Sequence, residues 1–525
     1  MSKRKATAGL FLTLTLSIAL VFGARPLQAA PELLETNPDS ALALTLAEFE
    51  GSFVSLDEAK QEAMKYATSV QEARAALKAA GGAHRKEKGA FDPELFAEGE
   101  KSRFRQPSAF AVPGVGSFAI VQEDERLTGS AGLRLKSPLG TKLEASLNTT
   151  RLESNSPYLA LKPQYTNFGK IEVTQPLLSG FGPGTAADLS SARRALEAAR
   201  ARYADAVLSL NAEVEQTYWD LYAAERDLAV QILIRDRAAA FLNETELKAA
   251  VGRVGPNQVA NARVFLAEQE QAVLDREENL DKISDQLSTL LGQRASSVRY
   301  RPSDQPPSDF PVEDPDSLVQ KALEENRNLK VAEKNWAAAR SLAKGAGWNA
   351  LPKLDLYGIL GANGLSGTDT LNGPFAGNAD RAWTQVFQRD YPTWNVGFRF
   401  SLPIGLRSGL GERQRLSGEA ERAYQQYVAA RRGLEEDVRA SYRELLHAKR
   451  RLEAARTGVE ASAEQVRIGM LEYQVGRTTA FELVRLSADL ATAQQRYSQA
   501  LVRAAKAAAE LKKLTTSEIE TQNNN

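Results

Sequence analysis

The sequence predicts a mainly helical fold built from two copies of one unit, in which amphipathic strands lead into a long helical hairpin. Three observations predict it. Long proline-free stretches are rich in alanine and charged residues, short stretches between them alternate apolar and polar residues, and the second half of the chain repeats the first at constant spacing. The strands suit either the wall of a membrane β-barrel or a soluble sheet with one wet face.

Six stretches have the helical composition, and the longest two far exceed an ordinary globular helix. They cover Ser55–Lys88, Thr185–Ala250, Asn257–Leu291, Asp316–Lys344, Glu412–Tyr473 and Thr479–Leu514. In the longest two, apolar residues such as Val438, Leu445 and Leu452 recur every seven positions, and the paired positions hold small residues such as Ala448. Sustained heptads with small partners predict closely packed coiled-coil contacts.

Strand-like stretches precede each long helix. Residues Trp394, Val396, Phe398 and Phe400 alternate with polar residues, as do several shorter apolar sets elsewhere. Aromatic side chains near the strand ends stand where the aromatic girdle of a membrane barrel would lie. The stretch Gly361–Asp380 is rich in glycine and asparagine and is predicted to be a long exposed loop.

The two copies align without a gap through the helical hairpins. Tyr218 matches Tyr442 at an offset of 442 − 218 = 224, and Val251–Arg253 falls on Val475–Arg477 at the same offset. The strand region of the first copy is longer, and the extra length would fit one additional hairpin around Ser137–Gly140.

The predicted organisation follows the duplication. In order, we expect a signal peptide at 1–29, a first repeat at 30–297 with strands at about 91–178 and a helical hairpin at about 185–292, a proline-rich linker at 298–315, a second repeat at 316–516 with strands at about 351–404 and a hairpin at about 412–514, and a polar tail at 517–525.

The amino-terminal segment has the pattern of an export signal. Lys3, Arg4 and Lys5 precede an apolar run that ends near Ala24, and Ala29 offers a cleavage site. A retained membrane anchor is the alternative to a cleaved signal.

Composition excludes several classes of function. Lys+Arg and Asp+Glu both number 66, so no basic excess indicates nucleic-acid binding, and the absence of cysteine excludes disulfides and thiolate metal sites. The two histidines, His84 and His447, lie far apart without a ligand cluster, so we expect no metal and no cofactor. Gly180, Gly182 and Gly184 fit a strand-to-helix elbow better than a phosphate-binding loop, because the spacing is wrong for the latter. No nucleophile–base constellation is present, so an enzyme is not expected.

Five segments carry a resemblance to a known family. They are a strand end at Pro176–Gly180, a first hairpin tip at Val251–Arg253 followed by Val259–Arg263, and a second tip at Tyr473–Arg477 followed by Phe481–Leu483. Together with the duplication, they make nearly the whole mature chain resemble the outer-membrane efflux proteins, the TolC-like ducts.

The resemblance implies a homotrimer, whose strands form one β-barrel surrounded by outer-membrane lipid and whose helices form one periplasmic tunnel. Such a duct serves a tripartite efflux or type I secretion system, docking a periplasmic adaptor that is joined to an inner-membrane transporter. The implied docking residues of the two tips are Val251, Gly252, Arg253, Val475, Gly476 and Arg477.

The resemblance also implies a periplasmic gate of tyrosine and acidic side chains, which falls on Tyr473 and Glu482. Arg485 stands where a second acidic ring is expected, Thr478 where an arginine is frequent, and Gln258 where the first tip would be acidic. Arg485 would partly neutralise a ring of Glu482 side chains, which leaves the ion selectivity of the gate open.

Two alternatives to a duct remain open from the residues alone. An exported coiled-coil spacer or adhesin would have soluble sheets and no conductance, and a single-chain porin would lack the long helices. The placement of amphipathic strands directly before each long helix, twice, favours the duct.

Overall fold

The computed structural model describes residues 38–112, 116–156, 159–294, 299–369, 373–475 and 477–516. The predicted signal peptide, the predicted polar tail and Gly476 lie outside this part of the chain. The chain divides into two compact units. The tip unit comprises Leu221–Ile283, Arg451–Ala500 and the described residues before Ser52, and the sheet unit comprises Ser52–Asp220, Ser284–Arg450 and the described residues from Leu501 onwards. Each unit contains segments of both sequence copies.

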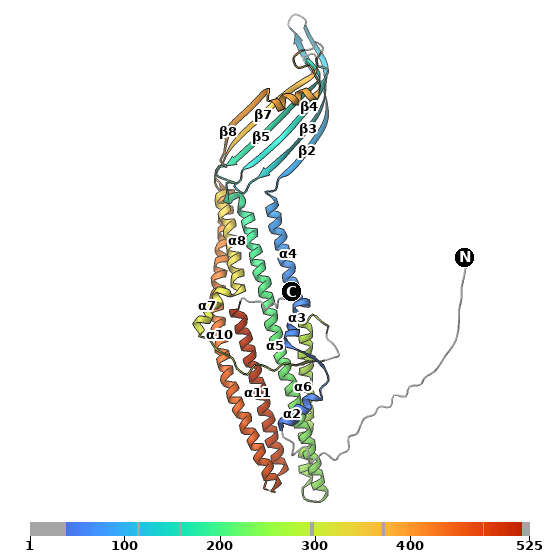
Figure 1. Cartoon of the computed structure of the whole chain (residues 1–525), viewed down its shortest axis with the longest axis vertical. Coiled ribbons are helices and arrows are strands. Elements are labelled where there is room, and N and C mark those ends of the chain that lie inside the picture. Colours follow the sequence, from blue (N-terminus) through green and yellow to red (C-terminus); the bar gives the residue numbers. More distant parts are fainter. Residues whose placement is uncertain are drawn as a thin grey trace, which may run out of the picture. The chain divides into compact units, whose positions relative to one another are not determined.

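Six antiparallel strands form one sheet in the sheet unit (Figure 1). They are β2 (Glu94–Val112), β3 (Gly116–Lys136), β4 (Lys142–Ser154), β5 (Leu161–Pro176), β7 (Lys353–Asp369) and β8 (Tyr391–Ser401), in the spatial order β2-β3-β4-β5-β7-β8. Four strands come from the first copy and two from the second. The extra hairpin anticipated near Ser137–Gly140 is present, because a tight turn there joins β3 to β4, with Gly140 at φ +94°.

The sheet has one apolar and one polar face, as period-two alternation requires. The apolar face carries exposed large side chains from all six strands, including Leu95, Leu133, Leu147, Ile171, Leu360 and Phe398. The polar face carries a row of ion pairs across the middle strands, in which Lys170 lies 3.1 Å from Glu144 and 2.7 Å from Glu172. Within the described residues, the apolar face therefore has no covering layer over most of its area.

Two long helical hairpins repeat with the spacing of the sequence. The helices are α5 (Pro183–Ala250) and α6 (Pro256–Leu290) in the first copy, and α10 (Arg407–Gln474) and α11 (Ala480–Thr515) in the second. The starts of α5 and α10 differ by 407 − 183 = 224, as do their ends, 474 − 250 = 224. No helix in the described part of the chain is long and apolar enough to span a membrane.

The heptad positions pack as predicted. Val438 and Leu445 are buried, and the small residue Ala448 is fully buried. In the tip unit, a Cβ atom at Gly469 of α10 would lie 2.6 Å from Leu486 Cδ1 of α11, so the absence of a side chain lets the two helices approach closely.

Each helix predicted before the strands is two helices. The stretch Ser55–Lys88 forms α3 (Leu56–Tyr66) and α4 (Thr68–Gly89), and the stretch Asp316–Lys344 lies within α7 (Pro315–Glu325) and α8 (Arg327–Asn349). The breaks fall at Ala67 and Asn326, whose ψ values of 129° and 126° are extended rather than helical. The breaks are 326 − 67 = 259 residues apart, and so are the N-cap residues of α3 and α7, Ser55 and Asp314.

The linker is fixed to α5 through Tyr218, which is fully buried. Strand β6 (Tyr300–Pro302) pairs in parallel with β1 (Ser52–Val54). The Tyr218 hydroxyl lies 3.0 Å from the Val54 carbonyl oxygen and 3.1 Å from Asp304 Oδ2, and it accepts a hydrogen bond from the Asp304 N–H at 3.1 Å. Burial raises the pKa of the Tyr218 phenol to about 12.

The predicted loop at Gly361–Asp380 is largely structured. Residues as far as Asp369 continue β7, and the helix α9 (Ala379–Gln388) begins at the other end of the stretch. The glycines serve packing: a Cβ atom at Gly361 would lie 2.7 Å from the Phe168 ring, and one at Gly364 would lie 1.9 Å from the Ala382 carbonyl oxygen. The glycines of this stretch therefore allow a neighbouring ring and helix α9 to approach strand β7 closely, and they do not indicate a flexible loop.

The remaining short helix, α2 (Pro38–Ala47), belongs to the tip unit. Its Leu42 is buried against Ala229 and Val230 of α5 and Ala491 of α11. This helix was not among the predicted elements.

Candidate functional site: the two hairpin tips

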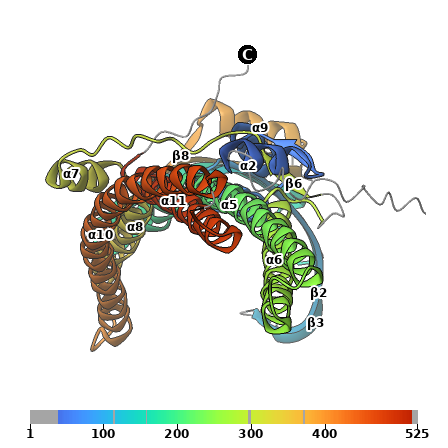
Figure 2. The same ribbon diagram turned by 90° about the horizontal axis from the view of Figure 1, so that it is seen from below.

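The tip unit holds the turns of both hairpins. Seen from below in Figure 2, its helices follow one another side by side, with α11 between α10 and α5, and α6 beside α5. Gln499 of α11 donates to Asp227 Oδ2 of α5 at 3.0 Å, and Gln231 of α5 donates to Gln269 of α6 at 3.0 Å. These contacts fix the two hairpins within one unit.

The first turn ends α5 in a Schellman motif. Gly252 has φ +74°, its N–H donates to the Ala249 carbonyl at 2.9 Å, and the Arg253 N–H donates to the Lys248 carbonyl at 2.9 Å. Glycine is required here because the left-handed conformation is costly for other residues. Apart from its two chain neighbours, no described residue has an atom within 4 Å of where a Gly252 Cβ atom would lie, so the space around the turn is open.

The second turn repeats the bond that spans five residues. The Arg477 N–H donates to the Glu472 carbonyl at 2.8 Å, which is the bond of Arg253 moved by 224 positions. Val251 and Val475, one residue before each glycine position, are 69% and 68% exposed. The two turns therefore share this backbone bond and an exposed valine.

The predicted gate residues lie beside the second turn. Tyr473 is half-buried in the last turn of α10, and Glu482 lies in the first turn of α11, where its N–H receives a cap from Thr479 Oγ1 at 3.3 Å. The structure brings Glu482 and Arg485 together, since Arg485 Nη2 lies 2.6 Å from Glu482 Oε1. Both side chains are exposed enough for solvent to screen the pair strongly.

A groove of about 660 Å³ lies within the tip unit between α5, α6 and α11. Its apolar lining includes Phe241, Phe265 and Val484, and its polar lining includes Arg485 and Gln258. Phe241 and Phe265 were not among the predicted site residues, although two aromatic residues near the turn of one helical hairpin are an available signal. The groove requires side chains from three helices, and so tertiary structure is needed to find it.

A buried acidic group, Asp227, lies on α5 where this helix contacts α11. Asp227 is 8% exposed, and burial raises the pKa of its carboxyl. Hydrogen bonds from Gln495 and Gln499 lower this pKa but by less than burial raises it. Its Oδ1 atom has no hydrogen-bond partner within the described residues. The contact between α5 and α11 is thus partly polar and buried.

The glycine-rich segment after β5 is an elbow. It joins β5 to α5, with Gly180 at φ +87° and Gly182 at φ +43°. The Asn349 side chain accepts from the Gly180 N–H at 3.1 Å and donates to the Gly184 carbonyl at 3.0 Å. The Gly180 amide is therefore taken up by the protein itself, unlike the free amides of a phosphate-binding loop.

Comparison with known proteins identifies the family. The family model described as "Outer membrane efflux protein" matches residues 140–293 and 318–517, which include both helical hairpins and make up well over half of the chain. No curated protein matches the chain by sequence.

Solved structures share the fold. The outer-membrane channel OprN has 19% identity and a TM-score of 0.61, with 88% of this chain and 89% of that chain covered. VceC from Vibrio cholerae has 16% identity and a TM-score of 0.60, with 88% and 97% covered. The open-state MtrE channel of Neisseria gonorrhoeae has 16% identity and a TM-score of 0.57, with 88% covered in each chain.

These matches confirm the predicted resemblance and the predicted fold class of long helices with antiparallel strands. They set aside the coiled-coil spacer or adhesin, because the family consists of non-enzymatic channels that function in tripartite efflux. The chain belongs to the outer membrane efflux protein family, and it is an outer-membrane efflux channel with a periplasmic helical part.

Proposed function

We propose that three copies of this chain form the outer-membrane duct of a tripartite efflux assembly. The sheets close into one β-barrel in outer-membrane lipid, the helices form one periplasmic tunnel, and the tips dock a periplasmic adaptor that is joined to an inner-membrane transporter. Each repeat, 30–297 or 316–516, supplies one hairpin to the tunnel, and the linker 298–315 joins the repeats.

The open sheet carries this proposal. Its edge strands β2 and β8 each have a single partner among the described strands, and its apolar face is exposed. An open edge and an uncovered apolar face are both liabilities for a protein that remains a single chain. Pairing β8 of one copy with β2 of the next removes both edges, and the lipid covers the apolar face.

The strand count gives the proposed barrel its size. Three sheets of six strands make a barrel of eighteen strands. Barrel diameter grows roughly in proportion to strand number, and barrels of about 16–18 strands enclose a water-filled channel. The two strands that the longer first copy adds therefore widen the exit.

The tips support the docking role. Val251 and Val475 are exposed beside left-handed or glycine-containing turns, where a partner helix can approach the backbone closely. We assign docking to Val251, Gly252 and Arg253 and to Val475, Gly476 and Arg477, and the periplasmic gate to Tyr473, Glu482 and Arg485.

The test uses the full chain expressed in a Gram-negative host. We expect it to fractionate with the outer membrane, to have three times the protomer mass by native mass spectrometry in mild detergent, and to conduct ions in a planar bilayer. A protein that stays monomeric, or that inserts without conductance, contradicts the proposal.

A further inference from the structure

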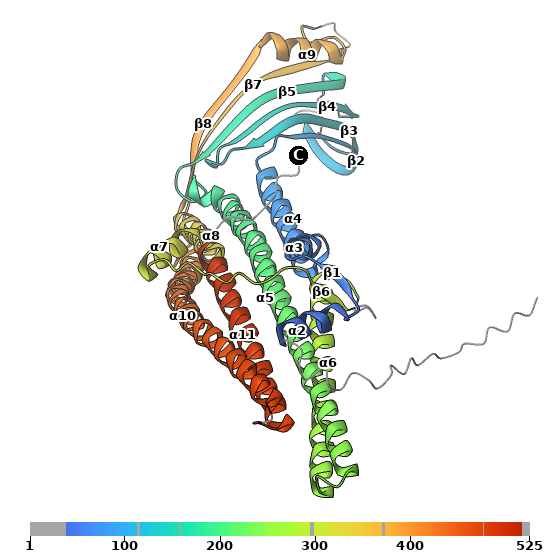
Figure 3. The ribbon, with the colours of Figure 1, turned by 60° about the horizontal axis from the view of Figure 1, so that its bottom comes forward.

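Helix α9 is fixed to the apolar face of the sheet. It lies across β7 and β5 (Figure 3), and its own residues Ala382 and Val386 are buried on the side that faces the strands. Gln385 Oε1 accepts a hydrogen bond from the Leu365 N–H of β7 at 2.8 Å. The position of the helix is therefore determined by packing and by a specific polar contact with the strand.

An apolar groove of about 760 Å³ adjoins the carboxyl end of α9. Its lining comes from the sheet and from the helix, and it includes Leu133, Leu147, Ile171, Leu360, Val386 and Trp394. The sheet residues of this set belong to the apolar face, which faces lipid in the proposed barrel. The groove is thus a recess in the lipid-facing wall.

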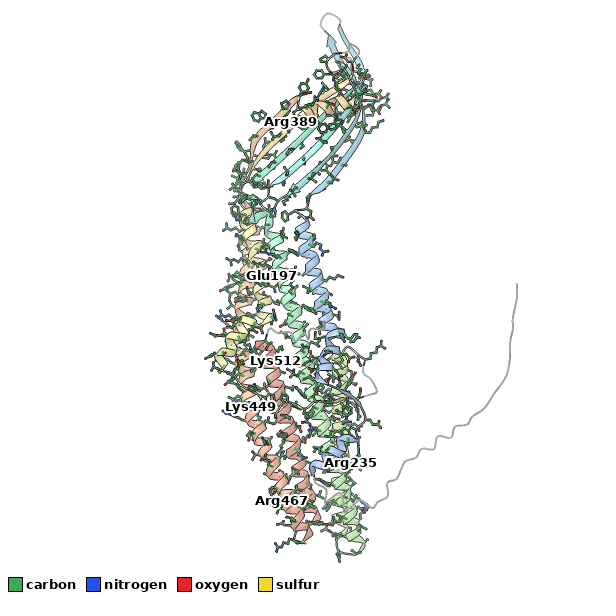
Figure 4. All side chains as sticks on the ribbon, in the orientation of Figure 1. Glu197, Arg235, Arg389, Lys449, Arg467 and Lys512 are labelled. Carbon is green, nitrogen blue, oxygen red and sulfur yellow. The ribbon has the colours of Figure 1, made fainter. Side chains whose placement is uncertain are left out.

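Arg389 supplies a cation at this groove (Figure 4). It caps α9 in the left-handed conformation at φ 59°, ψ 38°, where a non-glycine residue is strained. Its side chain is exposed and has no ion pair or hydrogen bond within the described residues. The other lining cation, Lys170, is paired with Glu144 and Glu172, and the neighbouring Asp390 does not line the groove.

The strand lengths give the depth of Arg389 in the membrane. Strand β8 has 11 residues, close to the roughly 9–11 that cross a bilayer. Its end at Ser401 leads into α10, which belongs to the periplasmic helical part, so its start at Tyr391 lies at the external side. Arg389 precedes that start by two residues and therefore lies at the level of the external headgroups.

We propose that this groove binds an acyl chain of a phosphate-bearing lipid of the outer leaflet, and that Arg389 donates hydrogen bonds to its phosphate. The guanidinium fork matches phosphate oxygens, and the apolar recess matches a hydrocarbon chain. The inference goes beyond the efflux role, but it rests on the proposed orientation of the apolar face toward lipid.

The test measures lipid binding to the full-length protein by native mass spectrometry in dodecyl maltoside micelles, whose detergent carries no phosphate. The probes are bis-phosphorylated lipid A, the same lipid after dephosphorylation, and inorganic phosphate. Because a hydrogen bond to a charged group is involved, we expect dephosphorylation of lipid A or Arg389→Gln to weaken binding about tenfold. We expect inorganic phosphate not to compete at the same concentration, since it has no acyl chain.

Two further variants separate the parts of the inference. Ala145→Phe fills the groove from the sheet and should reduce the binding of both lipid A forms. Arg413→Gln removes another exposed arginine on α10 that has no side-chain partner in the described residues, and it should not change lipid binding.

Equal binding by Arg389→Gln and the unaltered protein would overturn the phosphate contact, and unchanged binding by Ala145→Phe would overturn the groove. Competition by inorganic phosphate would overturn the choice of a lipid. Conductance is measured on the same samples. A protein that conducts but does not retain lipid A would contradict only this inference, whereas a protein that does not conduct would contradict the proposed function.

Discussion

Arg485 donates a hydrogen bond to Glu482 at 2.6 Å, one turn further along α11, so the acidic group assigned to the gate already has a cationic neighbour. In the proposed trimer, such a pair leaves the ring of three Glu482 side chains nearly neutral. We predict that Arg485→Ala makes the channel more selective for cations, and that Glu482→Ala makes it less so. The reversal potential under a KCl gradient measures both changes.

The matched control for the gate is Arg467→Ala. Arg467, labelled in Figure 4, lies on α10 and forms an ion pair with Glu464 that has the same three-residue spacing and the same distance of 2.6 Å. It should leave the reversal potential unchanged. If Arg485→Ala and Arg467→Ala behave alike, the charge pair at Glu482 does not lie in the ion path.

Docking at the first tip can be tested by cross-linking, since the chain has no native cysteine. We expect Val251→Cys to form a cross-link in cells to a periplasmic adaptor identified by mass spectrometry, because Val251 is 69% exposed. Adding Gly252→Asp should remove this cross-link, because the new side chain occupies the open space at the turn. Trimers should persist.

The control for docking is Leu274→Cys, which lies on α6 of the same unit and is 65% exposed. It should give no adaptor cross-link. An adaptor that cross-links equally well to both positions, or that tolerates Gly252→Asp, would show that the tip turn is not the docking surface.

The hairpins could be predicted closely from sequence because their signals are local and repeated. Heptads define the faces, and Gly252 in the C′ position ends α5, so the predicted end at Ala250 is the observed one. The predicted start at Thr185 differs from the observed Pro183 by two residues. The constant offset of 224 residues allowed the position of the second tip to be predicted from that of the first. The spacing of Glu482 and Arg485 likewise permitted their pairing to be anticipated.

The breaks at Ala67 and Asn326 could not be predicted in the same way. Alanine is the best helix former, so nothing local ends a helix at Ala67. At Asn326 the side chain caps α8 by accepting from the Leu329 N–H at 2.9 Å and donates to the Leu514 carbonyl of α11 at 3.2 Å. The second bond depends on tertiary structure. Tertiary structure is likewise needed to explain the glycines of β7, because they make room for α9, which packs on that strand.

Tyr218 tests whether the linker anchor stabilises the sheet unit. Tyr218→Phe leaves the ring but removes the hydroxyl that contacts Val54 and Asp304. The Val54 carbonyl keeps a bond from the Ser303 N–H and Asp304 Oδ2 keeps one from the Leu56 N–H, but the Asp304 N–H loses its acceptor. Because that N–H is left without a partner, we expect the free energy of unfolding to fall by about 1–3 kcal/mol. Thermal unfolding followed by helical circular dichroism measures it.

The duplication supplies the control for Tyr218. Tyr442, at the equivalent position of the second copy, is half-buried and has no side-chain hydrogen bond within the described residues. Tyr442→Phe should therefore be close to neutral. Equal losses in the two variants would mean that the Tyr218 hydroxyl does not stabilise the fold specifically.

Asp227 gives the helix contact a dependence on pH. Burial raises the pKa of its carboxyl, so the folded protein binds the proton more tightly than the unfolded chain. Its favourable contribution is therefore present below the unfolded pKa and is lost as the pH rises through the folded pKa. We predict that Asp227→Asn, which keeps an oxygen for Gln499, raises the melting temperature at pH 7 and has a smaller effect in acid.

Asp220→Asn is the comparison for this prediction. Asp220 accepts from Lys506 Nζ at 2.7 Å and should not show the stabilisation expected for Asp227→Asn. A lower melting temperature for Asp227→Asn at pH 7 would instead mean that the buried carboxylate is well compensated.

The two faces of β8 distinguish lipid from water. Phe398 is 75% exposed on the apolar face, and Asn395 lies on the polar face of the same strand. An arginine near the middle of the bilayer costs about 2–4 kcal/mol on the lipid side of a barrel strand, so we predict that Phe398→Arg lowers the yield of heat-resistant trimers in the outer membrane. Asn395→Arg should be tolerated and alter only conductance, because its side chain faces the water-filled interior of the proposed barrel. If Phe398→Arg assembles normally while Asn395→Arg does not, the apolar face points away from lipid and the proposed barrel is inside out.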